Sequence, residues 1–330
     1  MQDILKFVSN FEKKNKIFCD KKRSRVYELK KENFEDIELR PSKRKIYAVD
    51  GGSSIIYDGG SRTIAKIKIA SVGFSQEKKI LEEVAESVVG SVMSNDCIQI
   101  KTNPKNLFPN ENLPLSKIDE VQNTVRSAME WQQLLELSKT CEEGSILLAD
   151  SALTSTSKQD RKLLENLQKE TKNKNIILMG VCKTSRLRTN TGRSLIGYLN
   201  QLSDKGSWYY VPVFESENEN YFGKTFIVKF HPKSRFCYRV DLEKSVAQEL
   251  SNEKLKEIFG TVAYYASDPE LIGYPYPLLK ADKLARLRED EKLKGNQNVL
   301  MLSEKMGLSS IKFDENSNNM HEFLDKRAYR

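Results

Sequence analysis

Short apolar runs that end in polar or small residues constrain the fold of this chain more than any other feature. SILLAD at 145–150 and NIILMGV at 175–181 are apolar almost throughout, and a helix is expected between them at about 158–171. Strands without a polar face are typical of the centre of a sheet that helices cover on both sides. The sequence therefore predicts an α/β fold built on a mixed sheet.

The strands before this pair are expected to be antiparallel. IYAVD at 46–50 predicts a strand, and IAKIKIASVGF at 64–74 alternates around its two lysines, which indicates a strand with one face in water. ILEEVAESVVG at 80–90 is interpreted as a third strand, and a helix is expected at about 117–140. The predicted order is three antiparallel strands, then a helix, then parallel strands that alternate with helices.

Helical segments are expected at both ends of the chain. Apolar residues recur at helical spacing from Ile4 to Phe11, which predicts an amphipathic helix. A helix of the C-terminal segment is expected at about 277–294. We therefore expect one domain over residues 41–330, preceded by a helical extension over residues 1–40.

Charge and cysteine content limit the class of protein only loosely. The formal net charge of +8 favours polyanionic partners such as nucleic acid, although a lysine-rich surface that serves solubility explains it equally well. The five cysteines are scattered without a CxxC spacing, which indicates a reduced protein without a disulfide framework. No signal-peptide core and no apolar run of about 18 residues occurs, so we expect a cytoplasmic protein without a membrane segment.

Several kinds of catalytic site are excluded by what the chain lacks. Histidine occurs only at His231 and His321, and neither lies near a serine or cysteine motif, so a nucleophilic triad is not expected. No GxxxxGK[ST] and no HExxH motif occurs, which excludes a P-loop and this type of zinc site. Carboxylates at strand ends and on helix faces remain as the candidate chemical groups.

Two of these carboxylates follow strands directly. Asp50 ends the run IYAVD and precedes Gly51 and Gly52, and Asp150 ends the run SILLAD. If the two strands are neighbours, the acids meet, and a divalent cation such as Mg²⁺ or Mn²⁺ removes the repulsion between them. The alternatives are a turn cap for Asp50 and a helix N-cap or turn for Asp150.

Two further carboxylates lie on predicted helices. Glu130 is on the 117–140 helix, where Arg126 four residues earlier offers a surface ion pair as the alternative role. Asp282 falls on the apolar stripe of its helix, so it is expected to have a partner, either a metal or a core arginine or lysine. The order of the four acids along the chain is that of ribonuclease H-like nucleases, in which two metal ions activate water and stabilise the leaving oxygen.

The motifs around these acids resemble one family. IYAVDGGSS, LLADSAL, MGVCKTS and GYPYPLLKADKLARL are similar, in this order, to the motifs of NurA nucleases, over about residues 43–290. The resemblance implies a ribonuclease H-like fold and a Mn²⁺- or Mg²⁺-dependent DNA nuclease with a two-metal site. It also implies 5′–3′ exonuclease or endonuclease activity, a homodimer, and a hexameric HerA-type ATPase as partner in DNA end processing.

The resemblance also assigns roles to residues. It implies metal ligands at Asp50 and Asp150, and it makes Glu130 the match to the helix glutamate of the family, with Glu136 as the alternative. Tyr274 matches a tyrosine that contacts the phosphate or orders the site. Asp282 stands where the family has a histidine; an aspartate can still ligate a metal, but a proton-transfer role does not carry over.

A DNA-binding surface is expected from basic residues near the acids. Its candidate phosphate contacts are Lys183, Arg186, Arg188, Arg193, Lys280, Lys283 and Arg286. For each of them the alternative is a charge that only faces solvent. Tyr209, Tyr210 and Tyr276 are the candidates for stacking on bases.

Two other interpretations compete with a nuclease. Asp-Gly-Gly-Ser-Ser is similar to the first phosphate loop of actin-like ATPases and sugar kinases, but their second Asp-x-Gly loop and their Gly-Gly adenosine motif do not occur here. The other is a catalytically inactive adaptor that binds DNA or the ATPase. The replacement of the family histidine by Asp282 is the observation that favours it.

Overall fold

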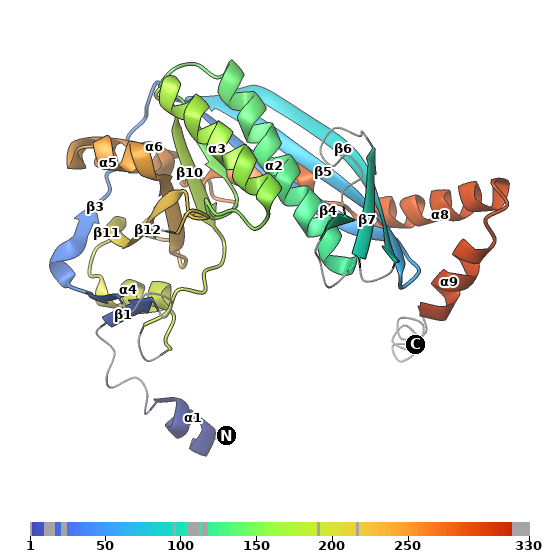
Figure 1. Ribbon diagram of the computed structural model, residues 1–330. Coiled ribbons are helices and arrows are strands. Elements are labelled where there is room, and N and C mark those ends of the chain that lie inside the picture. The colour runs from blue at the N-terminus through green and yellow to red at the C-terminus, as the bar shows by residue number, and fades with distance from the viewer. Residues whose placement is uncertain are drawn as a thin grey trace.

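The computed structural model describes residues 2–9, 17–20, 25–94, 97–103, 112–113, 118–189, 192–215 and 218–318. In this part of the chain, eleven strands form one mixed sheet with helices on both faces (Figure 1). Its order is β3-β11-β12-β13-β10-β9-β4-β5-β6-β7-β8. The strands are β3 (Phe34–Asp36), β4 (Lys45–Asp58), β5 (Arg62–Ser75), β6 (Lys78–Ser94), β7 (Cys97–Asn103), β8 (Asn112–Leu113), β9 (Ile146–Ala149), β10 (Ile177–Cys182), β11 (Trp208–Glu215), β12 (Gly223–Lys229) and β13 (Tyr238–Glu243).

The helices lie before, between and after these strands. They are α1 (Gln2–Ser9), α2 (Val121–Thr140), α3 (Lys158–Asn173), α4 (Leu195–Leu202), α5 (Lys244–Glu249), α6 (Asn252–Tyr265), α7 (Tyr276–Ala285), α8 (Glu289–Lys305) and α9 (Ser310–Asn318). The predicted helix at 277–294 is thus two helices, and the chain turns between them at Arg286–Arg288, where Leu287 is buried. No described helix is both long enough and apolar enough to cross a membrane.

The centre of the sheet has the predicted ribonuclease H-like order. β4, β5 and β6 form an antiparallel meander, and β9 and β10 follow β4 in parallel. Beyond β10 the sheet continues with antiparallel strands, beginning with β13. β13 was not expected from the sequence, and it brings the β12–β13 loop to the edge of the sheet where β10 ends.

β4 is longer than expected, because the strand does not end at Asp50. Its antiparallel pairing with β5 continues from Asp50, opposite Ala70, to Asp58, opposite Thr63. The two glycines after Asp50 pair in register like ordinary strand residues, so the expectation of a strand that stops at the aspartate is wrong. Asp50 therefore lies within a strand, and the residues before and after it pair with β5.

The two faces of the sheet carry separate hydrophobic cores. Ile46 and Ala48 of β4 pack with α6 and α7, and Tyr47 and Val49 pack with α2 and α3. Alternate residues of the central strands therefore belong to opposite cores, as the two-residue period of a strand requires. The face that was expected to be in water around Lys66 and Lys68 is largely covered, because α8 contributes Glu291, which forms an ion pair with the Lys68 ammonium group.

The N-terminal residues contribute to the edge of the same sheet. Within residues 1–40 the structure has α1, a two-stranded hairpin of β1 (Ile17–Asp20) and β2 (Arg25–Glu28), a short 3₁₀ turn and β3. β3 pairs with β11 in antiparallel register, and Phe34 packs edge-on against Trp208 with ring centroids 4.9 Å apart. This edge has its own apolar cluster, to which α4 contributes Leu195 and Leu199.

Candidate active site

Asp50 and Asp150 meet because their strands are parallel neighbours. Val49 of β4 pairs with Ala149 of β9, so the next residue along each strand is an aspartate. Strand alternation places both side chains on the α7 side of the sheet, the side that Ala48 also faces. The condition under which the two acids were expected to meet, neighbouring strands, is fulfilled.

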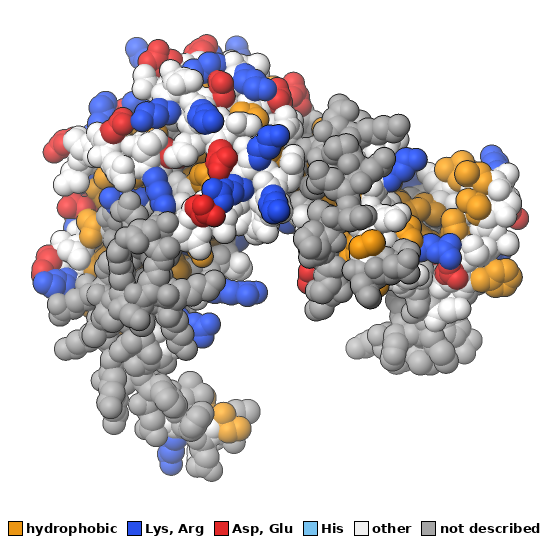
Figure 2. Space-filling view, viewed as in Figure 1, with side chains coloured by type: hydrophobic (Ala, Val, Ile, Leu, Met, Phe, Trp, Pro, Cys, Tyr) orange, Lys and Arg blue, Asp and Glu red, His pale blue; other side chains and the backbone are white. Residues whose placement is uncertain are grey.

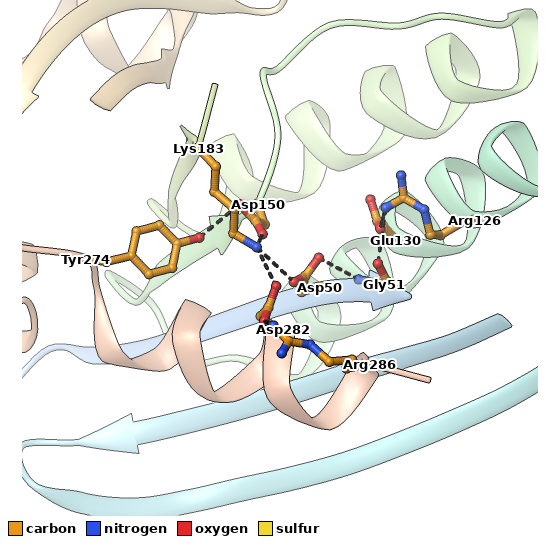
Figure 3. A network of polar contacts seen from close by, with 9 residues as sticks. All are labelled: Asp50, Gly51, Arg126, Glu130, Asp150, Lys183, Tyr274, Asp282 and Arg286. Atoms are coloured by element: carbon orange, nitrogen blue, oxygen red, sulfur yellow. Dashed lines mark hydrogen bonds and ion pairs between the residues drawn. The ribbon is translucent and has the colours of Figure 1, made fainter. Parts of the chain in front are cut away.

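The third aspartate comes from α7, which packs against β4 and β5. One carboxylate oxygen from each of Asp50, Asp150 and Asp282 lies within 4.8 Å of the others (Figure 3). Asp282 is on the apolar stripe that was predicted for its helix, between the buried Ala281 and Ala285. Three hard oxygen donors at this spacing fit a divalent cation such as Mg²⁺ or Mn²⁺.

Tyr274 approaches the aspartates from the segment before α7. Its hydroxyl donates a hydrogen bond to Asp150 Oδ1 at 2.9 Å, and its ring is buried. Gly273 has a φ of +97°, a value that a residue with a side chain adopts only under strain, so the turn into Tyr274 depends on this glycine. Tyr274 thereby orients the Asp150 carboxylate.

Lys183 lies at the centre of the cluster, because it follows β10 on the same side of the sheet. Its ammonium group forms an ion pair with Asp150, and it is 2.6 Å from Asp282 Oδ1 and 3.6 Å from Asp50 Oδ2 (Figure 3). It also lies 5.8 Å from the centroid of the Tyr274 ring. Lys183 was expected to contact phosphate, and here it supplies positive charge to all three carboxylates.

The protonation of the carboxylates reflects burial and mutual repulsion. Burial, together with the charge of Asp150, raises the pKa of Asp50 to about 8, although Lys183 acts against this rise. Burial also raises the pKa of Asp150, while Lys183 and Tyr274 partly offset that effect. For Asp282, burial acts upward, but hydrogen bonds and charge from Lys183 and Arg286 hold its pKa below the ordinary value. A cluster of this kind favours any added cation.

Glu130 lies beside this cluster, on the other face of β4. It forms a buried ion pair with Arg126, and the Arg126 guanidinium also donates to the Gly51 carbonyl oxygen at 3.2 Å. Burial raises the pKa of Glu130 to about 7, although Arg126 lowers it. An ion pair with Arg126 was the alternative to a metal-binding role for Glu130, and it is present. The glutamate is buried, however, and does not lie on the surface. Glu136 is exposed and contacts Gln132 and Lys139 on its own helix.

The two glycines after Asp50 let helices approach β4 from both sides. A Cβ atom at Gly51 would collide with the Glu130 carboxylate, and one at Gly52 would collide with the Ala285 carbonyl oxygen of α7. Gly51 therefore allows Glu130 to lie close to the site, and Gly52 allows α7 to bring Asp282 against β4. Two helices, one on each face of the sheet, therefore approach β4 closely at these glycines.

Several of the predicted phosphate contacts are paired with other protein groups. Lys280 is 3.7 Å from Glu82, Lys283 forms an ion pair with Glu270, and Arg286 lies 2.9 Å from Asp282. Arg193 donates to Gln201 and lies over the Tyr198 ring. Arg186 and Arg188 are exposed on the loop that follows Lys183. On the face seen in Figure 2, basic side chains are interspersed with acidic ones.

Two of the three tyrosines proposed for base stacking are buried, and the third is partly exposed. Tyr209 and Tyr210 are almost fully buried, and Tyr276 packs its ring edge-on against Phe74 at 5.5 Å. The position of Tyr209 and Tyr210 on β11 explains their burial, because β11 lies inside the sheet between β3 and β12. Tyr276, on α7, lines a surface cavity together with Phe74 and Tyr264.

The chain is similar to several solved structures and to one protein family. Solved structures similar to the chain include *Ciona intestinalis* Endonuclease V in complex with a 24mer DNA that contains an inosine followed by a ribo-adenosine, at 14% identity and a TM-score of 0.39, over 87% of this chain and 97% of that one. The catalytic domain of human Endonuclease V is similar at 12% identity and a TM-score of 0.40, over 84% and 93% of the two chains. *A. aeolicus* Argonaute is similar at 10% identity and a TM-score of 0.35, over 76% and 29%.

The sequence matches the model of one protein family. No curated protein matches the chain significantly. The family model of the NurA domain matches residues 44–287, which is well over half of the chain and includes every residue of the cluster described above. The chain therefore belongs to the NurA family.

Proposed function

We propose that this nuclease hydrolyses phosphodiester bonds of DNA with divalent metal held by Asp50, Asp150 and Asp282. The observation that carries the proposal is the convergence of these three carboxylates, from β4, the end of β9 and α7, to within 4.8 Å. These residues are far apart in the sequence but meet at one point. The side chains of Asp50 and Asp150 are buried there, although burial disfavours a charged carboxylate.

The donor set decides which cofactor fits. Carboxylate oxygens suit Mg²⁺ and Mn²⁺, and no cysteine or histidine is part of the described cluster. When bound, such ions supply an activated water and stabilise the charge of the leaving oxygen. We propose Glu130 as an additional ligand beside Asp50, which requires its carboxylate to leave Arg126.

The remaining residues of the site act on the substrate and on each other. Lys183 has a flexible stem and a half-exposed side chain, so its ammonium group can move from the carboxylates to a phosphate oxygen. Tyr274 keeps Asp150 in position through its hydroxyl group. Burial and the charge of Asp150 raise the pKa of Tyr274, so the hydroxyl stays protonated and remains a donor.

Cleavage of linear DNA with Mn²⁺, with Mg²⁺ and with EDTA tests the proposal directly. Wild type is compared with Asp50→Asn and Asp150→Asn, and Asp58→Asn on the same strand is the matched control. Asp58 is exposed and accepts only a turn hydrogen bond from Gly60, which an asparagine oxygen can also accept. Cleavage that persists in EDTA, or in both site variants, would sink the mechanism.

The adaptor remains the other outcome of the same experiment. A chain that binds DNA but does not cleave it with any metal, alone or with the ATPase, is an adaptor and not an enzyme. The structure gives a reason to expect cleavage, because Asp282 lies among the other aspartates in place of the family histidine. An aspartate at that position adds a ligand of the same type as the other two.

We propose a homodimer and a HerA-type hexameric ATPase as partners in DNA end processing, on the basis of family membership. A surface suited to protein contacts lies on α8 and α9, where hydrophobic side chains gather (Figure 2). Leu302, Met306 and Phe313 are exposed there, and the groove between α8 and β6 has a volume of about 760 Å³. Light scattering and co-purification with a HerA-type ATPase, for wild type and Met306→Lys, test these contacts.

A further inference from the structure

The loop between β12 and β13 lies at the edge of the sheet that carries the aspartates. β13 is antiparallel to β10, and Arg239 near its start pairs with Cys182 at the end of β10. Lys183 is the next residue after Cys182, so the residues just before β13 are neighbours of the site. Tyr238 confirms this placement, because its ring centroid is 5.4 Å from that of Tyr274.

The loop is fixed to the segment that carries Tyr274. Ser234 packs directly against Gly273, where a Cβ atom would collide with the serine side chain. The Ser234 hydroxyl accepts a hydrogen bond from the Phe236 backbone N–H at 3.1 Å and donates one to the Phe236 carbonyl oxygen at 2.9 Å. The backbone of Phe236 is therefore held in place by a buried serine that contacts the turn before α7.

The side chains that this fixed loop presents to solvent are aromatic and basic. Phe236 is 56% exposed, and Lys233 and Arg235 on the same loop are exposed too. Within the ranges that the structure describes, no ion pair involves Lys233 or Arg235. The Phe236 ring belongs to none of the three apolar clusters that the described residues form, and the loop that carries it is held beside Tyr274. An exposed aromatic ring in this position, together with these basic side chains, can reach a ligand of the site.

We propose that this loop grips an unpaired DNA strand beside the aspartates, with Phe236 stacked on a base and Lys233 and Arg235 against phosphates. The inference rests on the proposed nuclease function and adds to it the residues that hold a single strand or a frayed end. An aromatic platform flanked by cations is the combination that binds single strands without sequence preference. In a duplex the base faces are already stacked, so Phe236 has no partner there.

Charge and position favour a nucleic acid over a protein as the occupant. Two exposed cations precede the ring on the same loop, and Arg186 and Arg188 are exposed on the segment that follows Lys183. Tyr238 lies two residues after Phe236 and packs against Tyr274, whose hydroxyl binds Asp150, so Phe236 lies within a few nucleotides of a phosphate at the aspartates. A strand that reaches the aspartates therefore has bases within reach of the ring.

Binding without cleavage gives the clearest test. Wild type, Phe236→Ala and Phe236→Tyr are titrated in EDTA with single-stranded DNA that carries 2-aminopurine near one end, and with a blunt duplex. We expect Phe236→Ala to bind the single strand about 10-fold more weakly or worse and to lose the quenching of 2-aminopurine, while Phe236→Tyr retains both. Binding of the duplex should change little.

Salt dependence separates the ring from the cations. We expect Lys233→Ala and Arg235→Ala each to reduce the slope of log K against log salt by about 1, and Phe236→Ala to leave that slope unchanged. Lys162→Ala on α3 is the control for the cations, because Lys162 is exposed on the face of the sheet opposite α7. Val92→Ala on β6 is the control for loss of an exposed apolar side chain. Neither control should alter affinity for the single strand or quenching.

The possible results are distinguishable from failure of the proposed function. Unchanged affinity and quenching in Phe236→Ala would overturn the inference, even if wild type cleaves DNA as proposed. An equal loss for the single strand and the duplex would overturn the assignment to unpaired strands. A wild type that cleaves nothing but shows quenching that depends on Phe236 would refute the nuclease and leave the strand-binding loop in place.

Discussion

At the scale of single residues, the site consists of three carboxylates around the ammonium group of one lysine. The two strand-end motifs and the apolar stripe of one helix identify Asp50, Asp150 and Asp282, which the structure brings together. The position of Lys183 among them was not predicted, since the reach of a lysine depends on strand register that the sequence does not specify. The burial of the Glu130 ion pair was missed for the same reason.

The raised pKa of Asp50 predicts how stability of the metal-free protein changes with pH. Its pKa is about 8 in the folded chain and about 3.9 in the unfolded chain, so the folded state binds the proton more tightly. The contribution of Asp50 to stability is complete below pH 4 and is lost as the pH rises to 8. Asp50→Asn removes this loss, so in EDTA it should gain stability over wild type as the pH rises from 4 to 8.

Thermal or urea unfolding at pH 5, 7 and 9 measures this difference. Asp58→Asn serves as the control and should show no gain that depends on pH. If Asp50→Asn is destabilised relative to wild type at pH 9, the charge at Asp50 is compensated in the folded state and the prediction is wrong.

Lys183 is expected to compete with divalent cations for the aspartates. Its ammonium group contacts all three carboxylates, so a metal must displace it and meets its positive charge. We expect Lys183→Met to bind Mn²⁺ about 10-fold more tightly than wild type, a change of about 1.4 kcal/mol, and to cleave DNA more slowly. Calorimetric titration of Mn²⁺ checks the affinity, and an affinity equal to or weaker than that of wild type contradicts the competition.

At the scale of elements, periodicity predicts strand and helix positions well and their limits poorly. The central strands lie where the sequence places them, and so do the helices α2 and α3. β13 was missed although its residues, Tyr238–Glu243, alternate apolar and polar side chains, because the run is short and α5 follows it without an intervening turn. The continuation of β4 through Gly51 and Gly52 was missed because glycine pairs favour turns, whereas here they allow helices to pack closely.

Gly52 is therefore expected to determine how α7 lies on the sheet. In Gly52→Ala the new methyl group collides with the Ala285 carbonyl oxygen, so α7 shifts and takes Asp282 away from Asp50 and Asp150. We expect a loss of about 1–3 kcal/mol in the free energy of unfolding and a large loss of metal-dependent cleavage. Gly90→Ala on β6 is the control, since the nearest atom to its Cβ is 4.0 Å away.

Urea unfolding and cleavage rates measure the two effects of this substitution. A Gly52→Ala protein that keeps the stability and the cleavage rate of wild type would show that α7 relaxes without moving Asp282. Gly90→Ala is expected to keep the stability and the cleavage rate of wild type, because its methyl group meets no close neighbour among the described residues.

At the scale of the whole molecule, one sheet connects the site to the N-terminal residues. The expected division at residue 40 separates β3 from β11, although the two strands pair and Phe34 packs against Trp208 and Tyr210. Composition and periodicity do not reveal such edge pairing, because it depends on contacts between segments that are far apart in the sequence, such as Phe34 and Trp208. The boundary at residue 40 therefore remains a proposal that deletion variants can test.

Deletion of residues 1–40 should destabilise the chain more than deletion of residues 1–28. The longer deletion removes Phe34 and Leu29 from the cluster around Trp208, and loss of one buried phenylalanine alone costs about 3–5 kcal/mol. The shorter deletion keeps both residues and should unfold at a urea concentration near that of the full chain. Equal stability of the two variants would support a true extension that ends at residue 40.

The continuous path of β4 through the site has a mechanical consequence. Asp50 is attached to backbone that is paired with β5 before and after it, whereas Asp150 follows the end of β9, Lys183 follows the end of β10, and Asp282 moves with α7. Asp50 is thus the fixed reference of the site, and the other groups adjust around it. Repositioning during a reaction cycle then takes place in the turn after β9, in the lysine stem and in one short helix, without any strand changing register.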